Sequence, residues 1–421
     1  MTASSESNRK VVPLLCGREG TRSFGDNLST PYIPYYLMRL QATASQMGIF
    51  RALQSVLPNI FQLPWGYLSD RMGRRIIFIV IGGVLMSITL FSSIFVSDVT
   101  LLILIFSVNA IGYSMMIPTY SALLGDRIEH GRRGREFSRI VNYALAAGVF
   151  ANLFVLFYFS ITPPEDVNAY RTLFIISSGI GLASIVFLLP IRETNVTPER
   201  IKLITPSKFI PEFKYLIRVQ GIYTFFMSLS WPLFYFTMVD VLGAKNAEIA
   251  IVSLLGAVST IGFQKVVGMV LDRAGPVGLI IGSRFLFVIV PLGYGLATSV
   301  YHIYILTLIL GLGMAIVNVA FNAYILDISS EETRGEYFAY FNLVSGVAGF
   351  TGSILGGYLA SWLGGIYPVA TALLIIYIVS GIGRFSSACM FFKLKGVKKY
   401  PSTTRQVAGE VLSRLRNLFG E

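Results

Sequence analysis

A short charged loop lies between two long apolar runs near the start of the chain. It reads Gly66-Tyr67-Leu68-Ser69-Asp70-Arg71-Met72-Gly73-Arg74-Arg75, with apolar runs at 52–68 and 76–96. The loop combines a glycine that permits close helix approach, a carboxylate at a helix end, a turn glycine and three guanidinium groups. A carboxylate at the amino end of a helix interacts with its free N–H groups and dipole by roughly 0.3–2 kcal/mol. The loop is therefore suited to charge pairing and helix capping.

A second, less complete copy of this loop occurs in the other half of the chain. It reads Gly268-Met269-Val270-Leu271-Asp272-Arg273-Ala274-Gly275, so that Gly268, Asp272 and Arg273 match Gly66, Asp70 and Arg71. Gln62 and Gln264 match at the same offset, and Asp126, Arg133 and Gly134 match Asp327, Arg334 and Gly335 at nearly the same one. Because both pairs of loops are separated by nearly the same number of residues, they indicate a duplicated unit. An even number of spans per unit keeps both copies in the same orientation.

The composition is that of a membrane protein. Of 421 residues 54% are hydrophobic and only 13% charged, whereas soluble domains carry about 25% charged residues, and the mean hydropathy is +0.67. Apolar stretches of about 18 or more residues recur along the chain, which is typical of a polytopic helical protein. The runs are continuous rather than alternating, which favours helices over a β-barrel.

We predict an all-α polytopic fold with twelve spans. They are placed at 20–40, 46–68, 76–96, 101–124, 137–161, 172–189, 220–239, 249–270, 277–297 and 303–326, with two more in the uncharged stretch 337–383, divided at Gly364-Gly365 and Pro368. The expected organisation is a tail at 1–19, a six-helix bundle at 20–189, a linker at 190–219, a second bundle at 220–392 and a basic tail at 393–421. The linker is expected to include an amphipathic surface helix near 210–217.

The basic residues predict the orientation. Most loop arginines and lysines lie on the side of residues 70–75, whereas the other side offers only Arg39, Arg171 and Lys245. We therefore expect both termini in the cytoplasm and the protein in the cell membrane. The net charge of +12 is interpreted as topological rather than as a nucleic-acid surface. The stretch 407–419 has amphipathic spacing suited to the anionic inner leaflet.

The first loop resembles the loop between helices two and three of the major facilitator superfamily, written G-x-x-x-D-R-x-G-R-R, with all six named positions present. The resemblance implies two pseudo-twofold-related six-helix bundles and alternating access. It also implies that Asp70 and Asp272 meet the amino ends of spans eleven and five and latch the cytoplasmic side shut in an outward-open state. The expected latch residues are Gly66, Asp70, Arg71, Gly73, Arg74, Arg75, Arg133, Asp272, Arg273 and Arg334. The alternative is that these charges only fix topology.

Ionisable residues inside spans are costly and are functional candidates. Asp26 is the candidate for proton coupling, with Arg22 one turn before it; the alternative is a permanent structural ion pair at i, i+4 spacing. Arg51 and Arg284 are candidates for facing a water-filled cavity, whereas Lys265 and Arg384 are expected to extend to the headgroups.

Polar side chains recur in the spans that line the central cavity in this superfamily. The cavity candidates are Asn27, Arg51, Gln54, Asn59, Gln62, Asn109, Tyr113, Asn142, Tyr143, Tyr223, Trp231, Tyr235, Gln264, Arg284, Asn318, Asn322, Tyr340 and Asn342. The alternative is interhelical hydrogen bonding, worth about 0.6 kcal/mol per bond. The 22 tyrosines and 31 phenylalanines suit an amphipathic or aromatic substrate.

Some signatures are absent. Drug exporters often carry an arginine-glutamine-glycine motif in span four and a Gly-Pro motif in span five, but this chain has neither. Two histidines, two cysteines and no phosphate-binding loop argue against an enzyme, a metal cluster or an ATP motor. We expect a monomeric secondary transporter without a cofactor, nearest the drug-efflux type, exporting a small organic solute against protons. The alternatives are metabolite uptake, by symport or facilitated diffusion, and a non-transporting membrane sensor.

Overall fold

The computed structural model describes residues 3–128, 133–191, 209–330, 333–398 and 400, and this part of the chain is helical without a β-strand. The first half comprises α1 (Ala3–Ser29), η1 (Thr30–Tyr32), α2 (Ile33–Arg39), α3 (Ala44–Met72), α4 (Ile76–Ser92), η2 (Ser93–Phe95), α5 (Val99–Arg127), α6 (Arg133–Ile161) and α7 (Val167–Val186). The second half comprises α8 (Pro211–Ser230), η5 (Trp231–Leu233), α9 (Phe234–Phe236), η6 (Thr237–Val241), α10 (Asn246–Ala274), α11 (Pro276–Leu286), α12 (Ile289–Gly295), α13 (Val300–Ile328), α14 (Arg334–Gly364), α15 (Val369–Met390) and η7 (Phe391–Lys393).

These helices form the twelve predicted spans, because α1 with α2, α4 with η2, α8 through η6, and α11 with α12 each make one interrupted rod. Within the described residues, ten spans are long and apolar enough to cross a membrane. The first two spans fall below that hydropathy because α1 carries a cluster of charges and α3 carries prolines and amides. The chain is thus a multi-pass membrane protein, and the predicted fold class is confirmed.

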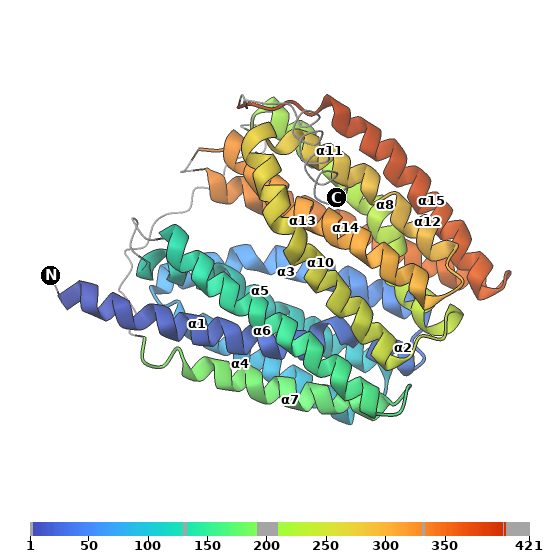
Figure 1. Ribbon diagram of the computed structural model, residues 1–421, viewed down its shortest axis with the longest axis horizontal. Coiled ribbons are helices and arrows are strands. Elements are labelled where there is room, and N and C mark those ends of the chain that lie inside the picture. The colour runs from blue at the N-terminus through green and yellow to red at the C-terminus, as the bar shows by residue number, and fades with distance from the viewer. Residues whose placement is uncertain (1–2, 129–132, 192–208, 331–332, 399, 401–421) are drawn as a thin grey trace, which may run out of the picture.

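The two halves form two bundles that lie side by side (Figure 1). Between them, α3 packs along α14 and α10 packs along α6. In the repeat, span two (α3) is equivalent to span eight (α10), and span five (α6) is equivalent to span eleven (α14). A pseudo-twofold axis therefore relates the α3–α14 contact to the α10–α6 contact. Because the helices alternate in direction, the bundles have two ends. We call the end with the loops after α2, α6 and η6 the Arg39 end, and the end with the loops after α3 and α10 the Asp70 end.

Spans seven and nine are interrupted for a local reason. Pro232 and Pro291 lack the N–H that would bond the carbonyl four residues earlier. The freed carbonyl of Phe287 accepts a hydrogen bond from Nη1 of Arg384 at 2.8 Å, and that of Ser228 accepts one from Oγ of Ser353 at 3.4 Å. Both interruptions are therefore satisfied by side chains from neighbouring spans.

Two expected boundaries are wrong. The first bundle does not begin at residue 20, because α1 starts at Ala3 and Leu15 and Cys16 are buried within the bundle. Residues 211–217 form no separate surface helix, because they are the first turns of α8, where the ring of Phe213 packs 4.4 Å from that of Tyr337. Residues 192–208 of the expected linker and 401–421 of the expected tail lie outside the described residues.

Candidate functional site

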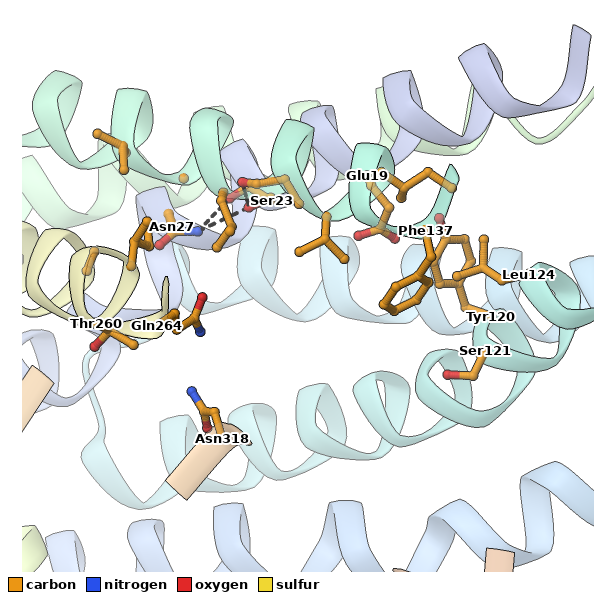
Figure 2. A pocket seen from close by; sticks show the side chains of 18 of the residues that line it. Glu19, Ser23, Asn27, Tyr120, Ser121, Leu124, Phe137, Thr260, Gln264 and Asn318 are labelled. Carbon is orange, nitrogen blue, oxygen red and sulfur yellow. Dashed lines mark hydrogen bonds between the residues drawn. The ribbon is translucent and has the colours of Figure 1, made fainter. Parts of the chain in front are cut away.

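A cavity of about 560 Å³ lies between the two halves. The first half contributes α1, α5 and α6, and the second contributes α10 and α13. Figure 2 shows Ser23 and Asn27 facing Thr260, Gln264 and Asn318, with Glu19, Tyr120, Ser121 and Phe137 grouped toward the other end. The wall is largely apolar, with hydroxyl and carboxamide groups and one carboxylate. Such a wall suits a small organic solute with an apolar body and a few polar groups.

The cavity extends toward the Asp70 end. One end of the cavity lies at Asn27 and Gly148, about half-way along α6. From there it continues along the bundle to Leu124 and Phe137, which lie near the end of α5 and the start of α6. This direction follows from the positions of the lining residues along their helices.

Asn152 of α6 joins both halves beside the Asn27 end of the cavity. Its Nδ2 donates to Oδ1 of Asn27 at 3.2 Å, and its Oδ1 accepts from the hydroxyl groups of Tyr32 at 3.3 Å and Ser253 at 2.8 Å. Asn152 is 1% exposed. The sequence analysis missed this residue, although a lone asparagine in the apolar stretch Ala151–Phe159 could have indicated it.

Four charged residues of α1 form a chain of ion pairs. Glu19 pairs with Arg18 and, at 3.1 Å, with Nη2 of Arg22, while Arg22 also pairs with Asp26 through Nη1. The i, i+3 and i, i+4 spacings place Glu19, Arg22 and Asp26 along one stripe of the helix. The guanidinium of Arg18 also lies 4.2 Å from the ring centre of Tyr120. The structure therefore confirms the Arg22–Asp26 pair as a contact and extends it to Glu19.

The two carboxylates face different spaces. Glu19 lines the central cavity, whereas Asp26 lines, with Arg18 and Arg22, a second pocket of about 30 Å³ between α1, α4 and α7. That pocket is large enough for about one or two water molecules. Glu19 was missed because it precedes the expected first span, although its i, i+3 spacing from Arg22 was a usable signal.

The Arg39 end is held closed around Asn246, the first residue of α10. Its Oδ1 accepts from the hydroxyl of Tyr170 at 2.8 Å, and its backbone N–H donates to the carbonyl of Pro164 at 2.8 Å. Nη2 of Arg39 donates to the carbonyl of Ala244 at 2.6 Å. Asn246 is 0% exposed, so three segments of the first half converge on Asn246 and the nearby Ala244 of the second half.

Further contacts between the halves lie closer to the middle of the spans. The guanidinium of Arg51 lies 4.8 Å from the ring centre of Trp231, and Tyr35 meets Tyr235 edge-on at 5.1 Å. A Cβ atom added to Gly48 would lie 2.8 Å from Cα of Gly357. Arg51, Trp231 and Tyr235 therefore belong to the interface between the halves, where α3 and α14 approach through glycines.

The charged loop is ordered within the first half. Arg75 lies 3.1 Å from Asp126 and 3.6 Å from Asp70. These contacts hold the start of α4 against the ends of α3 and α5. Gly73 adopts a left-handed φ of 62° at the end of α3, as a turn glycine should. The latch between halves that would include Gly66, Arg71, Arg74, Asp272, Arg273 and Arg334 stays a prediction, and the Arg133 side chain lies outside the described residues.

Three of the predicted cavity residues, Asn27, Gln264 and Asn318, line the cavity together. Others serve packing within or between bundles. Gln54 donates to the carbonyl of Phe106 at 2.9 Å, and Asn109 donates to Oγ1 of Thr89 at 2.8 Å. Also outside the cavity lining lie the predicted residues Asn59, Gln62, Tyr113, Asn142, Tyr143, Asn322, Tyr340 and Asn342.

The prediction that Arg284 faces a water-filled cavity is wrong. Arg284 is 2% exposed, and its guanidinium lies 4.5, 4.4 and 5.3 Å from the ring centres of Tyr223, Phe321 and Phe391. The predicted cavity residue Tyr223 is 0% exposed and donates its hydroxyl to the carbonyl of Arg284. Arg384 does not extend to headgroups either, since it is 2% exposed and bonded to the interrupted spans. Aromatic faces and backbone carbonyls hold both arginines in the second bundle.

Within the described residues, no group of three or more His, Cys, Asp or Glu side chains is placed to hold a metal ion.

Comparisons with known proteins agree with this architecture. The sequence pattern of the Major Facilitator Superfamily matches residues 20–300 and 219–420. The "Multi-drug resistance efflux pump PmrA" of Streptococcus pneumoniae is 22% identical over 354 residues, covering 80% of this chain and 86% of that protein. The "Uncharacterized MFS-type transporter MJ1317" of Methanocaldococcus jannaschii is 23% identical over 386 residues, covering 86% of this chain and 92% of that protein.

Solved structures match at the level of the fold. The nucleoside transporter NupG gives a TM-score of 0.68 at 13% identity, covering 92% of this chain and 100% of that chain. A bacterial homologue of the human lysosomal transporter Spinster, in an inward-facing and unoccupied conformation, gives 0.62 at 15% identity, covering 95% and 100%.

Proposed function

The chain belongs to the Major Facilitator Superfamily, and we propose that it exports a small organic solute by proton-linked alternating access. Family and fold are those of membrane transporters rather than enzymes. Export is supported by the similarity to a multidrug efflux pump, which suggests a drug or a metabolite as solute. The cavity between the halves supplies a binding place of suitable size and polarity.

The observation that carries the proposal is the chain of ion pairs between the two pockets. Glu19 at the cavity wall and Asp26 in the second pocket share Arg22. A proton or a solute that engages Glu19 weakens its hold on Arg22, and Arg22 then shifts its pairing toward Asp26. Two carboxylates that share one arginine are suited to such an exchange. When Glu19 is protonated, Arg22 pairs preferentially with Asp26, and when Glu19 is ionised, Arg22 pairs with both. Asp26 and Arg22 thus keep their proposed role in proton coupling, and Glu19 is the residue of the ion-pair chain that contacts the solute.

The proposed orientation places the Asp70 end in the cytoplasm, as the distribution of basic loops predicts. The cavity then extends toward the cytoplasm while the contacts of Asn246 close the outer side. This arrangement corresponds to an inward-open state that loads solute for export. In the opposite state, Asp70 and Asp272 would cap the amino ends of α14 and α6 and close the cytoplasmic side. One chain contains both halves and the cavity, so we propose a monomer, which contacts anionic lipid of the inner leaflet and needs no cofactor.

The test begins with a ligand and proceeds to flux. A thermal-shift screen of purified protein against neutral, cationic and anionic organic solutes identifies a ligand, since a ligand of the folded state raises the melting temperature. That solute is then offered to proteoliposomes with an acidic lumen. Accumulation driven by the outward proton gradient supports proton-linked export. Accumulation only with an alkaline lumen indicates symport, equilibration without a gradient indicates facilitated diffusion, and saturable binding without flux indicates a sensor.

A further inference from the structure

The segment that follows the last span folds back over the end of the second bundle. We call residues 394–400, as far as the structure describes them, the strap. The hydroxyl of Tyr324 donates to the carbonyl of Lys395 at 2.9 Å, which fixes the start of the strap to α13. At its far end, Nζ of Lys398 lies 2.8 Å from Oδ1 of Asp327, and the hydroxyl of Tyr400 donates to Oδ2 at 2.6 Å. Both oxygens of one carboxylate are therefore held by the strap.

The strap also covers the turn between α10 and α11. The ring of Tyr400 packs on Gly275, where an added Cβ atom would lie 2.5 Å from the ring. Gly275 has a φ of 74°, so the turn itself also favours glycine. The strap thus connects the end of α13 to the turn that follows Asp272.

The repeat shows what the strap replaces. In the first half, Asp126 near the end of α5 pairs with Arg75, which belongs to the turn after Asp70. Asp327 is the repeat equivalent of Asp126, but the equivalent of Arg75 is Val277, in the first turn of α11. The second loop copy therefore lacks the arginine that serves the first.

A cavity marks the place of the missing arginine. A space of about 290 Å³ is lined by Val277, Asp327, Lys398 and Tyr400, among others. Val277 and Asp327 thus lie on the same hollow, whereas their equivalents in the first half, Arg75 and Asp126, are in direct contact. The strap lines this hollow with its ammonium group and its phenol.

We propose that the strap replaces the arginine that the second repeat lacks. Lys398 and Tyr400 bind Asp327 as Arg75 binds Asp126, and in this way they position the turn that follows Asp272. Burial, and then the hydrogen bond and charge of Asp327, raise the pKa of Tyr400 to about 12, so the phenol keeps its proton and acts as a donor at neutral pH. The inference concerns positioning and does not depend on the solute or on proton coupling. Any process that draws the strap away would release the end of α13 from the α10–α11 turn.

The experiment measures exposure of the α13 end without any solute. A single reporter, Ser329→Cys, is placed in full-length protein carrying Cys16→Ser and Cys389→Ser, and its reaction with a maleimide is timed in detergent. Combining Lys398→Ala with Tyr400→Phe is expected to raise the labelling rate by a factor of about three to ten, as the loss of a hydrogen bond to a charged group suggests. The matched control is Lys395→Ala, which removes a strap charge whose contact with α13 is through its backbone carbonyl.

The decisive step is rescue. Adding Val277→Arg to the Lys398→Ala and Tyr400→Phe protein is expected to return the labelling rate to within about twofold of its starting value, because the new guanidinium fills the hollow beside Asp327. If the protein with Val277→Arg is not monodisperse, Val277→Lys is used for the same rescue. In the first repeat, Arg75→Ala is expected to raise labelling of Ile128→Cys in the same way. The proposal is overturned if the double substitution labels like Lys395→Ala, or if neither cation at position 277 slows the labelling.

Discussion

The hydroxyl of Tyr170 in α7 lies 2.8 Å from Oδ1 of Asn246 in α10, and this contact joins the two halves of the protein at the Arg39 end. Both residues are 0% exposed. A buried hydrogen bond between bundles is lost whenever they separate at this end, so the contact contributes directly to the free energy that keeps the Arg39 end closed.

Asn246→Ala is therefore expected to open the Arg39 end. Loss of the amide removes the acceptor for Tyr170 and the donor to the Asp166 carbonyl, at about 1–3 kcal/mol for the buried groups left unpaired. The measurement is the distance between spin labels at Ser45 and Ser361, which lie on α3 and α14 and bond across the halves. We expect a longer-distance population that the unsubstituted protein lacks. Asn168→Ala is the control, because Asn168 bonds to Arg171 within the first half; equal distances in both variants would contradict the prediction.

The charge chain of α1 predicts an order of stability for two conservative substitutions. Glu19→Gln leaves Arg18, which is 2% exposed, without its carboxylate, and breaking a buried ion pair costs about 3–5 kcal/mol. Asp26→Asn costs less, because Arg22 keeps Glu19 as a partner. We expect the melting temperature to fall further for Glu19→Gln than for Asp26→Asn. Glu165→Gln should leave it close to unchanged, because the Glu165 side chain is 66% exposed in its pair with Arg39.

The same two substitutions test proton coupling. In proteoliposomes, both are expected to abolish accumulation driven by a pH gradient while solute exchange at equal pH continues, at a rate reduced by no more than about tenfold. Full gradient-driven transport by Asp26→Asn would show that the Arg22–Asp26 pair is structural only. Because exchange needs no net proton movement, the comparison separates lost coupling from lost binding.

The sequence predicted the twelve spans, the repeat and the charged loops well, because long apolar runs and short loop motifs are local features of the chain. It predicted Asn27, Gln264 and Asn318 in the cavity by the position of their spans in the family fold. It could not separate these from Gln54 and Asn109, whose amides face neighbouring helices, because helix rotation depends on packing. Arg284 shows the same limit: only the fold shows that three aromatic rings from distant segments surround it.

The boundary of the first span was missed for an energetic reason. Residues 11–19 include Arg18 and Glu19, which a hydropathy argument assigns to solvent, yet the two charges neutralise each other inside the bundle. Pairing of neighbours along a helix offsets part of the desolvation cost that would otherwise exclude them. A search for opposite charges at i, i+3 and i, i+4 spacing beside an apolar run would have found this extension.

Among substitutions in the second bundle, replacement of Arg384 is expected to cause the largest loss of stability. Its guanidinium donates to the carbonyls of Phe287 and Met227 and to Oγ of Ser230, which belong to two interrupted spans. Arg384→Met removes the donor that satisfies the freed carbonyl of Phe287, whereas the Met227 carbonyl keeps the Ser230 hydroxyl and Ser230 keeps the Ser380 hydroxyl as partners. We expect a loss of about 1–3 kcal/mol, measured as a lower midpoint of thermal unfolding. Lys393→Ala in η7 is the control. A midpoint within experimental error of the control would show that the two interruptions do not need this arginine.

The loop motif predicts a state-dependent closure at the Asp70 end. Asp70→Asn keeps the shape of the side chain but weakens its attraction to a helix amino end, by roughly 0.3–2 kcal/mol. We expect the population that is open at the Asp70 end to grow, so that a cysteine at Ser121, which lines the cavity, reacts about two- to tenfold faster with a water-soluble maleimide. Glu212→Gln in the first turn of α8 is a control that removes an acid from the same end of the protein but not from the amino end of α14 or α6. Unchanged labelling in Asp70→Asn would mean that the charge only fixes topology.

Finally, the cavity geometry predicts which carboxamides contact solute. Gln264 and Asn318 line the cavity on the second half, opposite Asn27 (Figure 2). Asn322 lies one turn after Asn318, outside the cavity lining, and its Nδ2 donates to the Asn318 carbonyl at 2.6 Å. Loss of one neutral hydrogen bond to solute is expected to weaken binding about three- to tenfold, so Gln264→Ala and Asn318→Ala should raise KM by that factor. Asn322→Ala should leave KM within about twofold, because its amide bonds to its own helix. A raised KM in Asn322→Ala together with an unchanged KM in Asn318→Ala would place the solute elsewhere between the halves.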